Sequence, residues 1–375
     1  VIKDPKEVDI RFGFCFPDVY EVGMSHLGSR ILYHVLNQRK DTYCERVYAP
    51  WPDMEKLMRE NNIPLYALET KDPINEFNFL AFTLQYEMSY TNILNMLNMG
   101  GIPLRASERT EKDPLVIAGG PCAYNPEPLY DIVDIFQLGE GEEGLNDLLD
   151  LYQKHKDNFN KEAYLREASH IPSVYIPSLY DVTYNEDGTI KEFIPKYDDV
   201  PKKVKKRIIN NFDQVDFPES LIVPYSEIVH DRVVLELFRG CTNGCRFCQA
   251  GMIYRPVREK SRKTLLDQAR KMLKATGYDE VSLVSLSTCD YSDIQGLVKD
   301  LIEEHGKNNV SVALPSIRVD AFSVDLLKEI QKVRKTGLTF APEAGSQRMR
   351  DVINKGLSEK RILEAAKNAF ESGWS

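Results

Sequence analysis

The run ELFRGCTNGCRFCQAG, residues 236–251, brings together Cys241, Cys245 and Cys248 with the spacing Cys-x-x-x-Cys-x-x-Cys. It begins inside an apolar stretch, VVLELF, which predicts a buried strand. Three thiolates on one loop can hold three irons of a cubane [4Fe–4S] cluster and leave the fourth iron open for a substrate or cofactor. Structural zinc is the alternative, but it takes four ligands, usually from two separated Cys or His pairs, and the nearest further candidate is His230, beyond the strand.

Composition limits the classes of function. A chain of 375 residues with 42% apolar residues favours two or three domains with real cores. A net charge of −9 does not indicate a general nucleic-acid or membrane surface. The basic run VPKKVKKRIINN, residues 200–211, is interpreted as a solvated linker, with an RNA contact as the alternative.

Cysteine usage and the lack of targeting segments indicate the compartment. We find no signal peptide and no apolar stretch of membrane-spanning length, which predicts a cytoplasmic protein that does not bind membranes. Seven cysteines, three of them clustered, are typical of metal binding rather than of a disulfide framework. Reducing and anaerobic surroundings follow, because oxygen damages a cluster with an open iron.

The first part of the chain, residues 1–156, alternates strand and helix patterns. Short apolar strands separated by helices predict an α/β fold with an open, doubly wound parallel sheet, Rossmann-like in type. The predicted strands are 7–17, 42–50, 77–85, 114–121 and 131–138, and the predicted helices are 22–38, 54–62, 89–101 and 145–155.

The remaining chain divides in two. Residues 157–230 lose the helical pattern and predict a linker with a small β element, in which VTYNEDGTIKEF is a hairpin closed by an Asp-Gly turn. Residues 231–375 regain the alternation, with predicted strands at 233–238, 279–287, 310–316 and 337–343. About four βα units predict a partial (β/α) barrel, and we expect the chain to be a fragment that ends inside it.

The cysteine spacing, the strand before it and Phe247 ahead of the third cysteine resemble the radical SAM superfamily. The continuation RGCTNGCRFCQAGMIYRPVREKS is similar to an uncharacterised group with an N-terminal cobalamin-binding-like domain. The resemblance implies a [4Fe–4S] cluster on the three cysteines, with S-adenosylmethionine (SAM) chelating the open iron. It also implies reductive cleavage of SAM to methionine and a 5′-deoxyadenosyl radical, and an electron-donor partner such as flavodoxin or ferredoxin.

Contacts to SAM are expected at the carboxyl ends of successive strands. The family often has a Gly-Gly-Glu-like stretch after the second strand, where this chain has small hydroxyl residues. Two of these, Ser287 and Thr288, have an alternative role as caps of the next helix. The full set of expected SAM contacts is Phe247, Ser285, Ser287, Thr288, Ser316, Arg318 and Glu343.

The N-terminal domain has a degenerate form of a cobalamin motif. Cobalamin-binding domains carry Asp-x-His-x-x-Gly after the first strand, and here Asp18, Tyr20 and Gly23 occupy the three positions. Tyr20 thus stands where the axial histidine would be. Glycines at later turns permit close approach of a ligand to the backbone. These glycines are Gly119, Gly120, Gly139 and Gly141.

Three functions stay open. The leading hypothesis is a radical SAM enzyme on an unknown substrate, with cobalamin-dependent methyl transfer as one form of it. A methylthiotransferase acting on tRNA or protein would use a second cluster, for which Cys15, Cys44 and Cys122 are the available thiols. A redox or cobalamin sensor without catalysis is the third. The sequence contains neither a P-loop nor the Gly-x-Gly-x-x-Gly fingerprint of dinucleotide-binding domains.

Overall fold

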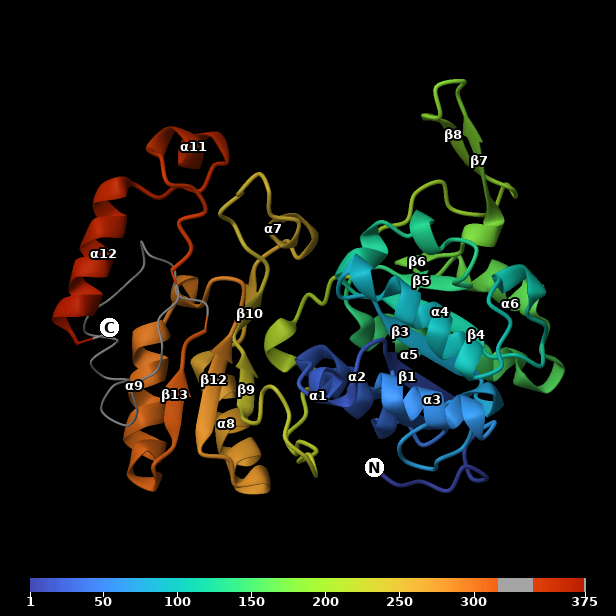
Figure 1. Ribbon diagram of the computed structural model, residues 1–375, viewed down its shortest axis with the longest axis horizontal. Coiled ribbons are helices and arrows are strands. Elements are labelled where there is room, and N and C mark those ends of the chain that lie inside the picture. The colour runs from blue at the N-terminus through green and yellow to red at the C-terminus, as the bar shows by residue number, and fades with distance from the viewer. Residues whose placement is uncertain (316–339, 374–375) are drawn as a thin grey trace. The chain divides into compact units, whose positions relative to one another are not determined.

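The computed structural model describes residues 1–315 and 340–373 (Figure 1). Contacts between residues divide the chain into two compact units. The first unit comprises Val1–Ile209 and Glu227–Val229, and the second comprises Asn210–Ser226 and His230–Ser375. The change from one unit to the other therefore falls inside the segment predicted as a linker, residues 157–230.

The first unit is built on a six-stranded sheet with the order β2-β1-β3-β4-β5-β6. All neighbouring strands are parallel except β5 and β6, which are antiparallel. This order, with β1 between β2 and β3, is that of a doubly wound fold and confirms the predicted class. The strands are β1 (Ile10–Phe16), β2 (Thr42–Tyr48), β3 (Phe79–Thr83), β4 (Leu115–Gly119), β5 (Ile135–Gln137) and β6 (Val174–Tyr175).

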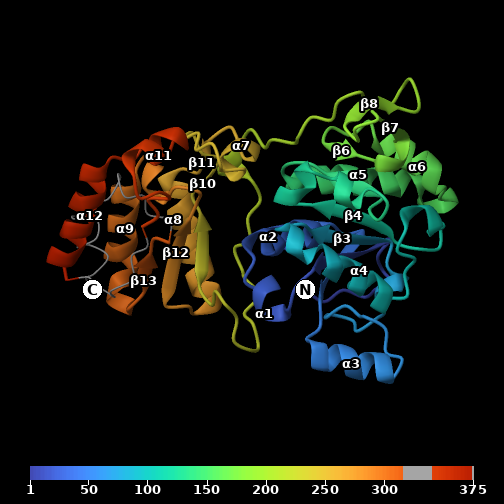
Figure 2. The ribbon, with the colours of Figure 1, turned by 45° about the horizontal axis from the view of Figure 1, so that its top comes forward.

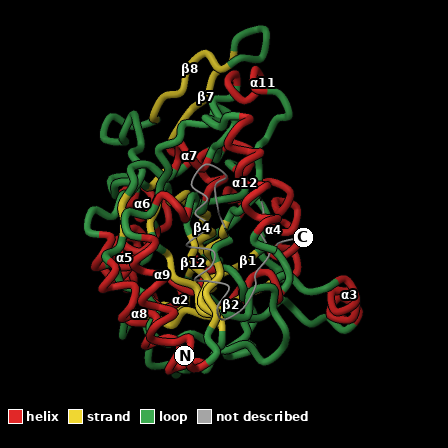
Figure 3. Tube along the Cα trace, turned by 90° about the vertical axis from the view of Figure 1, so that its left-hand side faces the viewer, coloured by secondary structure: helices red, strands yellow, loops and turns green. Residues whose placement is uncertain are grey.

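Helices cover both faces of this sheet. Figure 3 shows α2 and α5 on one side of the strands and α3 and α4 on the other. The helices are α1 (Tyr20–Gly23), α2 (Leu27–Gln38), α3 (Pro52–Glu60), α4 (Tyr90–Met99), α5 (Gly141–His155) and α6 (Lys161–Ala168). Short 3-10 helices connect them: η1 (Ile74–Glu76), η2 (Glu87–Ser89), η3 (Ala106–Glu108), η4 (Pro121–Tyr124), η5 (Glu127–Leu129), η6 (Lys156–Asn158) and η7 (Pro177–Leu179).

Aromatic packing joins the sheet to α5 and α6. The ring of Phe79 lies 5.9 Å from that of Phe12 and 4.9 Å from that of Tyr152, measured between centroids. Tyr164 of α6 is buried against the same rings. Because α6 and β6 complete this core, residues 157–175 form part of the first unit rather than a connector.

The helix predicted over 22–38 is interrupted, so that α1 and α2 are separate. His26 caps α2, because its Nδ1 accepts the hydrogen bond of the Ser29 amide at 3.1 Å. Burial lowers the pKa of His26 to about 4, which keeps the ring an acceptor at neutral pH.

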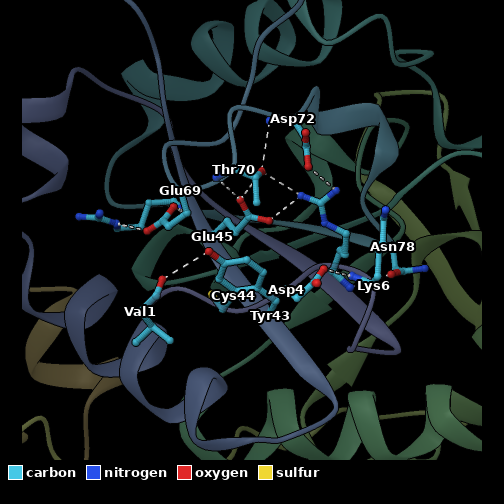
Figure 4. Close-up of polar contacts among 12 residues, drawn as sticks. Val1, Asp4, Lys6, Tyr43, Cys44, Glu45, Glu69, Thr70, Asp72 and Asn78 are labelled. Atoms are coloured by element: carbon cyan, nitrogen blue, oxygen red, sulfur yellow. Dashed lines mark hydrogen bonds and ion pairs between the residues drawn. The ribbon is translucent and has the colours of Figure 1, made fainter.

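A buried ion pair fixes β2 to the loop before β3 (Figure 4). The Glu45 carboxylate, with no exposed side-chain area, accepts hydrogen bonds from Arg11 at 2.6 Å and from the amide and hydroxyl of Thr70 at 2.9 and 2.6 Å. Arg11 also pairs with Asp72 at 2.9 Å and lies 4.3 Å from the centre of the Phe77 ring. Each carboxylate oxygen of Glu45 therefore has a partner, as burial of a charge requires.

The predicted hairpin is confirmed. Strands β7 (Tyr180–Tyr184) and β8 (Ile190–Pro195) pair antiparallel. The turn between them contains Asp187 and Gly188, and Gly188 has a φ of +80°, which a residue with a side chain rarely adopts.

The second unit has a parallel sheet of order β13-β12-β9 and an antiparallel pair, β10 and β11. Figure 2 shows β10, β11 and α7 together beyond one end of the three-stranded sheet. The strands are β9 (Val233–Glu236), β10 (Phe238–Arg239), β11 (Arg258–Glu259), β12 (Glu280–Val284) and β13 (Ser311–Ala313). The helices are α7 (Ala250–Ile253), α8 (Arg262–Thr276), α9 (Ile294–His305), α11 (Gln347–Val352) and α12 (Glu359–Glu371), with 3-10 helices η8 (Phe212–Gln214), η9 (Thr288–Asp290) and η10 (Gly306–Asn308).

Local signals explain where α8 begins and ends. The Ser261 hydroxyl accepts the hydrogen bond of the Thr264 amide at its start, and Gly277 closes its end with a φ of +74°. Leu265, Ala269 and Met272 lie on one face at helical spacing and are buried.

The segment before β9 packs onto this unit through a buried lysine. The Lys260 ammonium lies 3.6 Å from the centre of the Phe217 ring and 5.2 Å from that of Phe212. Both rings are buried, so residues 210–226 are part of the core of the second unit.

Three of the four predicted strands of the partial barrel are present as β9, β12 and β13. The fourth was predicted over 337–343. Residues 337–339 lie outside the described residues, and Phe340–Glu343, which are described, form no strand. Within residues 1–315 and 340–373, no helix combines the length and apolar character needed to cross a membrane.

Candidate functional site

The three clustered cysteines lie on the loop between β10 and α7, here named the cluster loop (residues 240–249). All three are free and partly exposed, whereas Cys15, Cys44 and Cys122 are buried. Gly240 begins the loop with a φ of +97°, and a Cβ there would lie 2.7 Å from the Pro256 oxygen. Only glycine permits this close approach, which turns the chain out of β10 and leaves the thiols accessible.

The cluster loop is tied to the residues after α11. The Arg246 amide donates to the Ile353 oxygen at 3.0 Å, and the Asn354 side-chain amide donates to the Gly244 oxygen at 2.9 Å.

At the entry to the loop, Glu236 accepts two hydrogen bonds from Arg239. Burial raises the pKa of Glu236, but the charges of Arg239, Lys260 and Arg258 outweigh burial and hold that pKa below its usual range.

Two of the three sulfurs accept hydrogen bonds. The Asn243 amide nitrogen lies 3.3 Å from the Cys241 sulfur, and the Gly251 backbone nitrogen lies 3.3 Å from the Cys248 sulfur. Donors of this kind stabilise thiolates, the form that binds iron. Among the described residues, no three His, Cys, Asp or Glu side chains converge on one point as ligands of a single ion would. A cubane does not require that convergence, because each thiolate binds a different iron. The donor set therefore fits a cluster.

The turn after β12, here named the β12 turn (residues 285–290), holds three of the predicted SAM contacts. The Ser285 and Thr288 hydroxyls lie 3.3 Å apart, and Thr288 also donates to the Leu283 oxygen at 3.3 Å. Ser287 is 3% exposed, and its hydroxyl has no partner among the described residues.

The capping alternative for Ser287 and Thr288 is wrong, because Asp293 caps α9 by accepting from the Gly296 amide at 3.2 Å. A buried hydroxyl without a partner is costly unless a ligand or water completes it. Ser287 therefore fits a polar ligand such as SAM.

The side chains of Glu343 and Phe247 both lie near the ammonium group of one lysine. The Lys355 ammonium lies 3.1 Å from the Glu343 carboxylate and 6.0 Å from the centre of the Phe247 ring. Phe247 itself is 54% exposed, which leaves its ring open to a planar or cationic ligand. Sequence reasoning missed Lys355, because nothing in the order of residues indicates which cation reaches the cluster loop. The other two predicted contacts, Ser316 and Arg318, lie outside the described residues.

The degenerate cobalamin motif lies at the carboxyl end of β1. Asp18 accepts hydrogen bonds from the Val19 amide at 2.7 Å and from the Tyr86 hydroxyl at 3.4 Å. Tyr20 packs edge-on against Tyr48, with centroids 5.5 Å apart. A Cβ on Gly23 would lie 2.3 Å from the Tyr48 ring, so this glycine serves packing within the chain.

The later glycines differ in what lies against them. Gly119 and Gly141 have ordinary or slightly tight contacts, whereas a Cβ on Gly120 would lie 2.9 Å from the Leu84 oxygen. At Gly139, with a φ of +95°, a Cβ would lie 2.3 Å from the Arg207 oxygen. Position 139 thus requires glycine because the backbone of Arg207 lies against it, not because a ligand does.

Replacing Gly139 with alanine is expected to destabilise the first unit by about 2–4 kcal/mol, because positive φ and a backbone clash add. Gly188→Ala is the matched control, since its φ is also positive but, apart from its chain neighbours, no atom of the described residues lies within 4 Å of the added Cβ. That variant should lose only the cost of the positive φ, about 1–2 kcal/mol. Guanidinium unfolding followed by circular dichroism measures both, and equal losses would contradict the role given to Arg207.

The orientations and pKa values of the buried cysteines disfavour a second metal centre on them. Strand register aligns Cys44 with Phe12 and Cys15 with Val47, so Cys15 and Cys44 point to opposite faces of the sheet. Burial raises the pKa of the thiols of Cys15, Cys44 and Cys122. Raised pKa values disfavour the thiolate form that binds metal.

Two family models match the chain. The model described as "Radical SAM proteins, N-terminal" matches residues 28–177, and that of the radical SAM superfamily matches residues 235–375. An uncharacterised protein of Methanocaldococcus jannaschii is 28% identical over 361 residues, which is 96% of this chain and 66% of that protein. A protein from the same organism named as a methylthiotransferase is 25% identical over 150 residues, 38% of this chain and 33% of its own length.

Two solved structures of the radical SAM methyltransferase TsrM from Kitasatospora setae match by fold. They are 13% and 12% identical, with TM-scores of 0.60 and 0.62, over 97% of this chain and 66% and 65% of TsrM. At this identity the likeness shows the fold alone. The chain thus spans less than two thirds of the length of the curated relatives and of TsrM.

Proposed function

We propose, from the premise that this chain belongs to the radical SAM superfamily, that it is an enzyme holding a [4Fe–4S] cluster on Cys241, Cys245 and Cys248 and binding SAM at the β12 turn. When bound, such a cluster supplies one electron that cleaves SAM to methionine and a 5′-deoxyadenosyl radical. The protein's part is to hold the reactants in register and exclude water.

The observation that carries the proposal is the buried hydroxyl of Ser287. It lies on the same turn as Asp290, which is hydrogen-bonded to Asn243 of the cluster loop at 3.1 Å. The unsatisfied group and the three thiols are therefore on two adjacent segments of one unit. A ligand with a metal-binding end and polar groups, such as SAM, suits this arrangement.

Charged and aromatic groups at the other side of the cluster loop extend the site. Lys355 is able to pair with a ligand carboxylate, and the exposed ring of Phe247 is able to stack on a base or contact a sulfonium. Glu343, which pairs with Lys355, orients that ammonium. Ser316 and Arg318 stay predictions.

Low-temperature electron paramagnetic resonance of the anaerobically reconstituted, reduced chain tests the proposal. A [4Fe–4S]⁺ signal whose g-values shift on addition of SAM is the expected result. A cluster signal that is indifferent to SAM would contradict the enzyme proposal and favour the sensor. Flavodoxin or ferredoxin, as the proposed electron donor, should support formation of 5′-deoxyadenosine by this protein.

Ser287→Ala is expected to weaken SAM binding about three- to tenfold, the effect of losing one hydrogen bond to a ligand. The concentration of SAM that gives half of the spectral shift measures this. Ser292→Ala, a change of an exposed serine just beyond the β12 turn, is the control and should leave binding unchanged. Equal binding by Ser287→Ala and the wild type would remove Ser287 from the site.

Methyl transfer with cobalamin is the finer form of the proposal. It is supported by the fold likeness to TsrM, one structure of which has cobalamin bound, and by the polar pair Asp18 and Tyr86 at the carboxyl end of the sheet. The fit is partial, since Tyr20 replaces the axial histidine and Arg207 fills the Gly139 turn. Titration with hydroxocobalamin followed by absorbance tests it, and no retained cobalamin after gel filtration would exclude this form.

A methylthiotransferase is the second candidate, favoured by the similarity to the Methanocaldococcus jannaschii protein of that name. It requires a second cluster, and the opposed orientations of Cys15 and Cys44 argue against one. Iron analysis separates the candidates, because two clusters contain about eight irons per chain and one contains about four.

A further inference from the structure

The Asn243 side chain connects a cluster cysteine to the β12 turn. Its amide nitrogen donates to the Cys241 sulfur at 3.3 Å and to the Asp290 carboxylate at 3.1 Å. A cysteine thiolate and a carboxylate only accept hydrogen bonds, so the NH₂ group rather than the amide oxygen must face both. Each hydrogen of that group therefore has one acceptor.

Asp290 in turn belongs to the turn that holds Ser287. It ends η9, and its amide donates to the Ser287 oxygen at 2.8 Å. The bridge Cys241–Asn243–Asp290 therefore joins segments 47 residues apart in sequence. One of its ends is an iron ligand under the proposed function, and the other is part of the proposed SAM turn.

We propose that Asn243 is a positioning residue that raises the reduction potential of the cluster through Cys241, and that Asp290 holds its amide in place. The inference rests on the proposed function in that the three cysteines carry the cluster. The physical reason is charge. Reduction adds an electron that spreads onto the cysteine sulfurs, and an N–H donor stabilises the more negative state more than the oxidised one.

The neighbouring donors show why position 243 is the one to change. The Cys248 sulfur accepts from the Gly251 backbone, which no side-chain substitution removes. Asn354 donates its side-chain amide to the Gly244 oxygen on the same loop at 2.9 Å and is not hydrogen-bonded to any sulfur of the described residues. Asn354→Ala therefore removes a side-chain amide that binds the cluster loop at a backbone oxygen, and it serves as the control for a general disturbance of the loop.

The test is a redox titration of the reconstituted full chain without SAM, monitored by electron paramagnetic resonance. Asn243→Ala is expected to make reduction about tenfold less favourable, which is about 59 mV toward negative potential for a one-electron couple. Asn354→Ala should leave the potential unchanged. Asn243→Gln, which keeps a carboxamide, should recover part of the shift. The signal comes only from chains that contain a cluster, so incomplete loading does not bias the midpoint.

Several outcomes would overturn the inference. An unchanged or raised potential in Asn243→Ala removes the role of the hydrogen bond. Equal shifts in Asn243→Ala and Asn354→Ala would indicate a general disturbance of the loop. If Asn243→Ala takes up no iron, the inference is tested with Asn243→Gln instead. A reduction potential of Asn243→Gln that lies further toward negative values than that of Asn354→Ala then supports the inference.

A double-mutant cycle with Asp290→Ala tests the anchor. In the Asn243→Ala background Asp290 acts only as a nearby negative charge, so its removal should raise the potential. In the wild-type background removal also frees the Asn243 amide, and the potential should rise less or fall. Equal shifts in both backgrounds would show that Asp290 does not hold Asn243.

The readouts separate this inference from the proposed function. A chain that assembles the cluster and shows the Asn243 effect, but does not respond to SAM, supports the bridge and contradicts the enzyme proposal. If the cluster responds to SAM but Asn243→Ala leaves the reduction potential unchanged, the enzyme proposal is supported and the bridge is contradicted.

Discussion

Replacing Cys245 with alanine is expected to reduce the iron content of the reconstituted chain from about four to below one per chain. Cys245 lies in the middle of the cluster loop, between the two cysteines whose sulfurs accept the Asn243 and Gly251 hydrogen bonds. With two thiolates left, two irons of the cubane would lack protein ligands instead of one. Formation of 5′-deoxyadenosine should fall to background.

Cys289→Ala is the matched control for this prediction. Cys289 is a partly exposed thiol on η9, next to Asp290, but it is not part of the Cys-x-x-x-Cys-x-x-Cys run. Its removal should leave iron content and the cluster signal as in the wild type. If Cys289→Ala lost the cluster and Cys245→Ala kept it, the assignment of ligands would be wrong.

The second large effect concerns stability. Replacing Arg11 with methionine is expected to cost about 3–5 kcal/mol, because it leaves the buried Glu45 carboxylate with no opposite charge. Thr70 would still donate two hydrogen bonds, which cannot replace the guanidinium. Hydrogen exchange of peptides covering β1 and β2 measures the loss, since those strands carry the pair and exchange reports the local free energy of opening.

Two further variants make this measurement decisive. The double variant Arg11→Met with Glu45→Met should recover most of the lost stability, since no charge is then buried alone. Lys56→Met removes an exposed ion pair with Glu60 on α3 and should change stability by about 0.5 kcal/mol or less. If Arg11→Met cost no more stability than Lys56→Met, the buried ion pair in Figure 4 would not stabilise the first unit.

Much of the fold was predictable because its signals are local. Alternating apolar strands and amphipathic helices predicted a doubly wound parallel sheet, and the observed order β2-β1-β3-β4-β5-β6 confirms that class. The Asp-Gly turn predicted the β7–β8 hairpin for the same reason. The membership of α6 and β6 in the first core was missed, because a two-residue edge strand has almost no periodic pattern.

In the candidate site, too, the residues that lie close in sequence were predictable, and those that only tertiary packing brings together were not. Cys241, Cys245 and Cys248 are close in sequence, so any fold of the loop keeps them close in space. Lys355 is 107 residues further on than Cys248, and only the packing of the chain after α11 brings its ammonium to Phe247. Tertiary packing also makes the Ser287 hydroxyl a buried group without a partner.

The order of residues alone was enough to predict most strands, most helices and the cysteine run, because each of these depends on neighbours within one or two turns of chain. Only the tertiary structure decided that Asn243 faces both Cys241 and Asp290, and that Arg207 rather than a ligand lies against Gly139. Such contacts join residues tens of positions apart. Their partners are selected by the shape and polarity of the packed surfaces, which no local pattern of residues specifies.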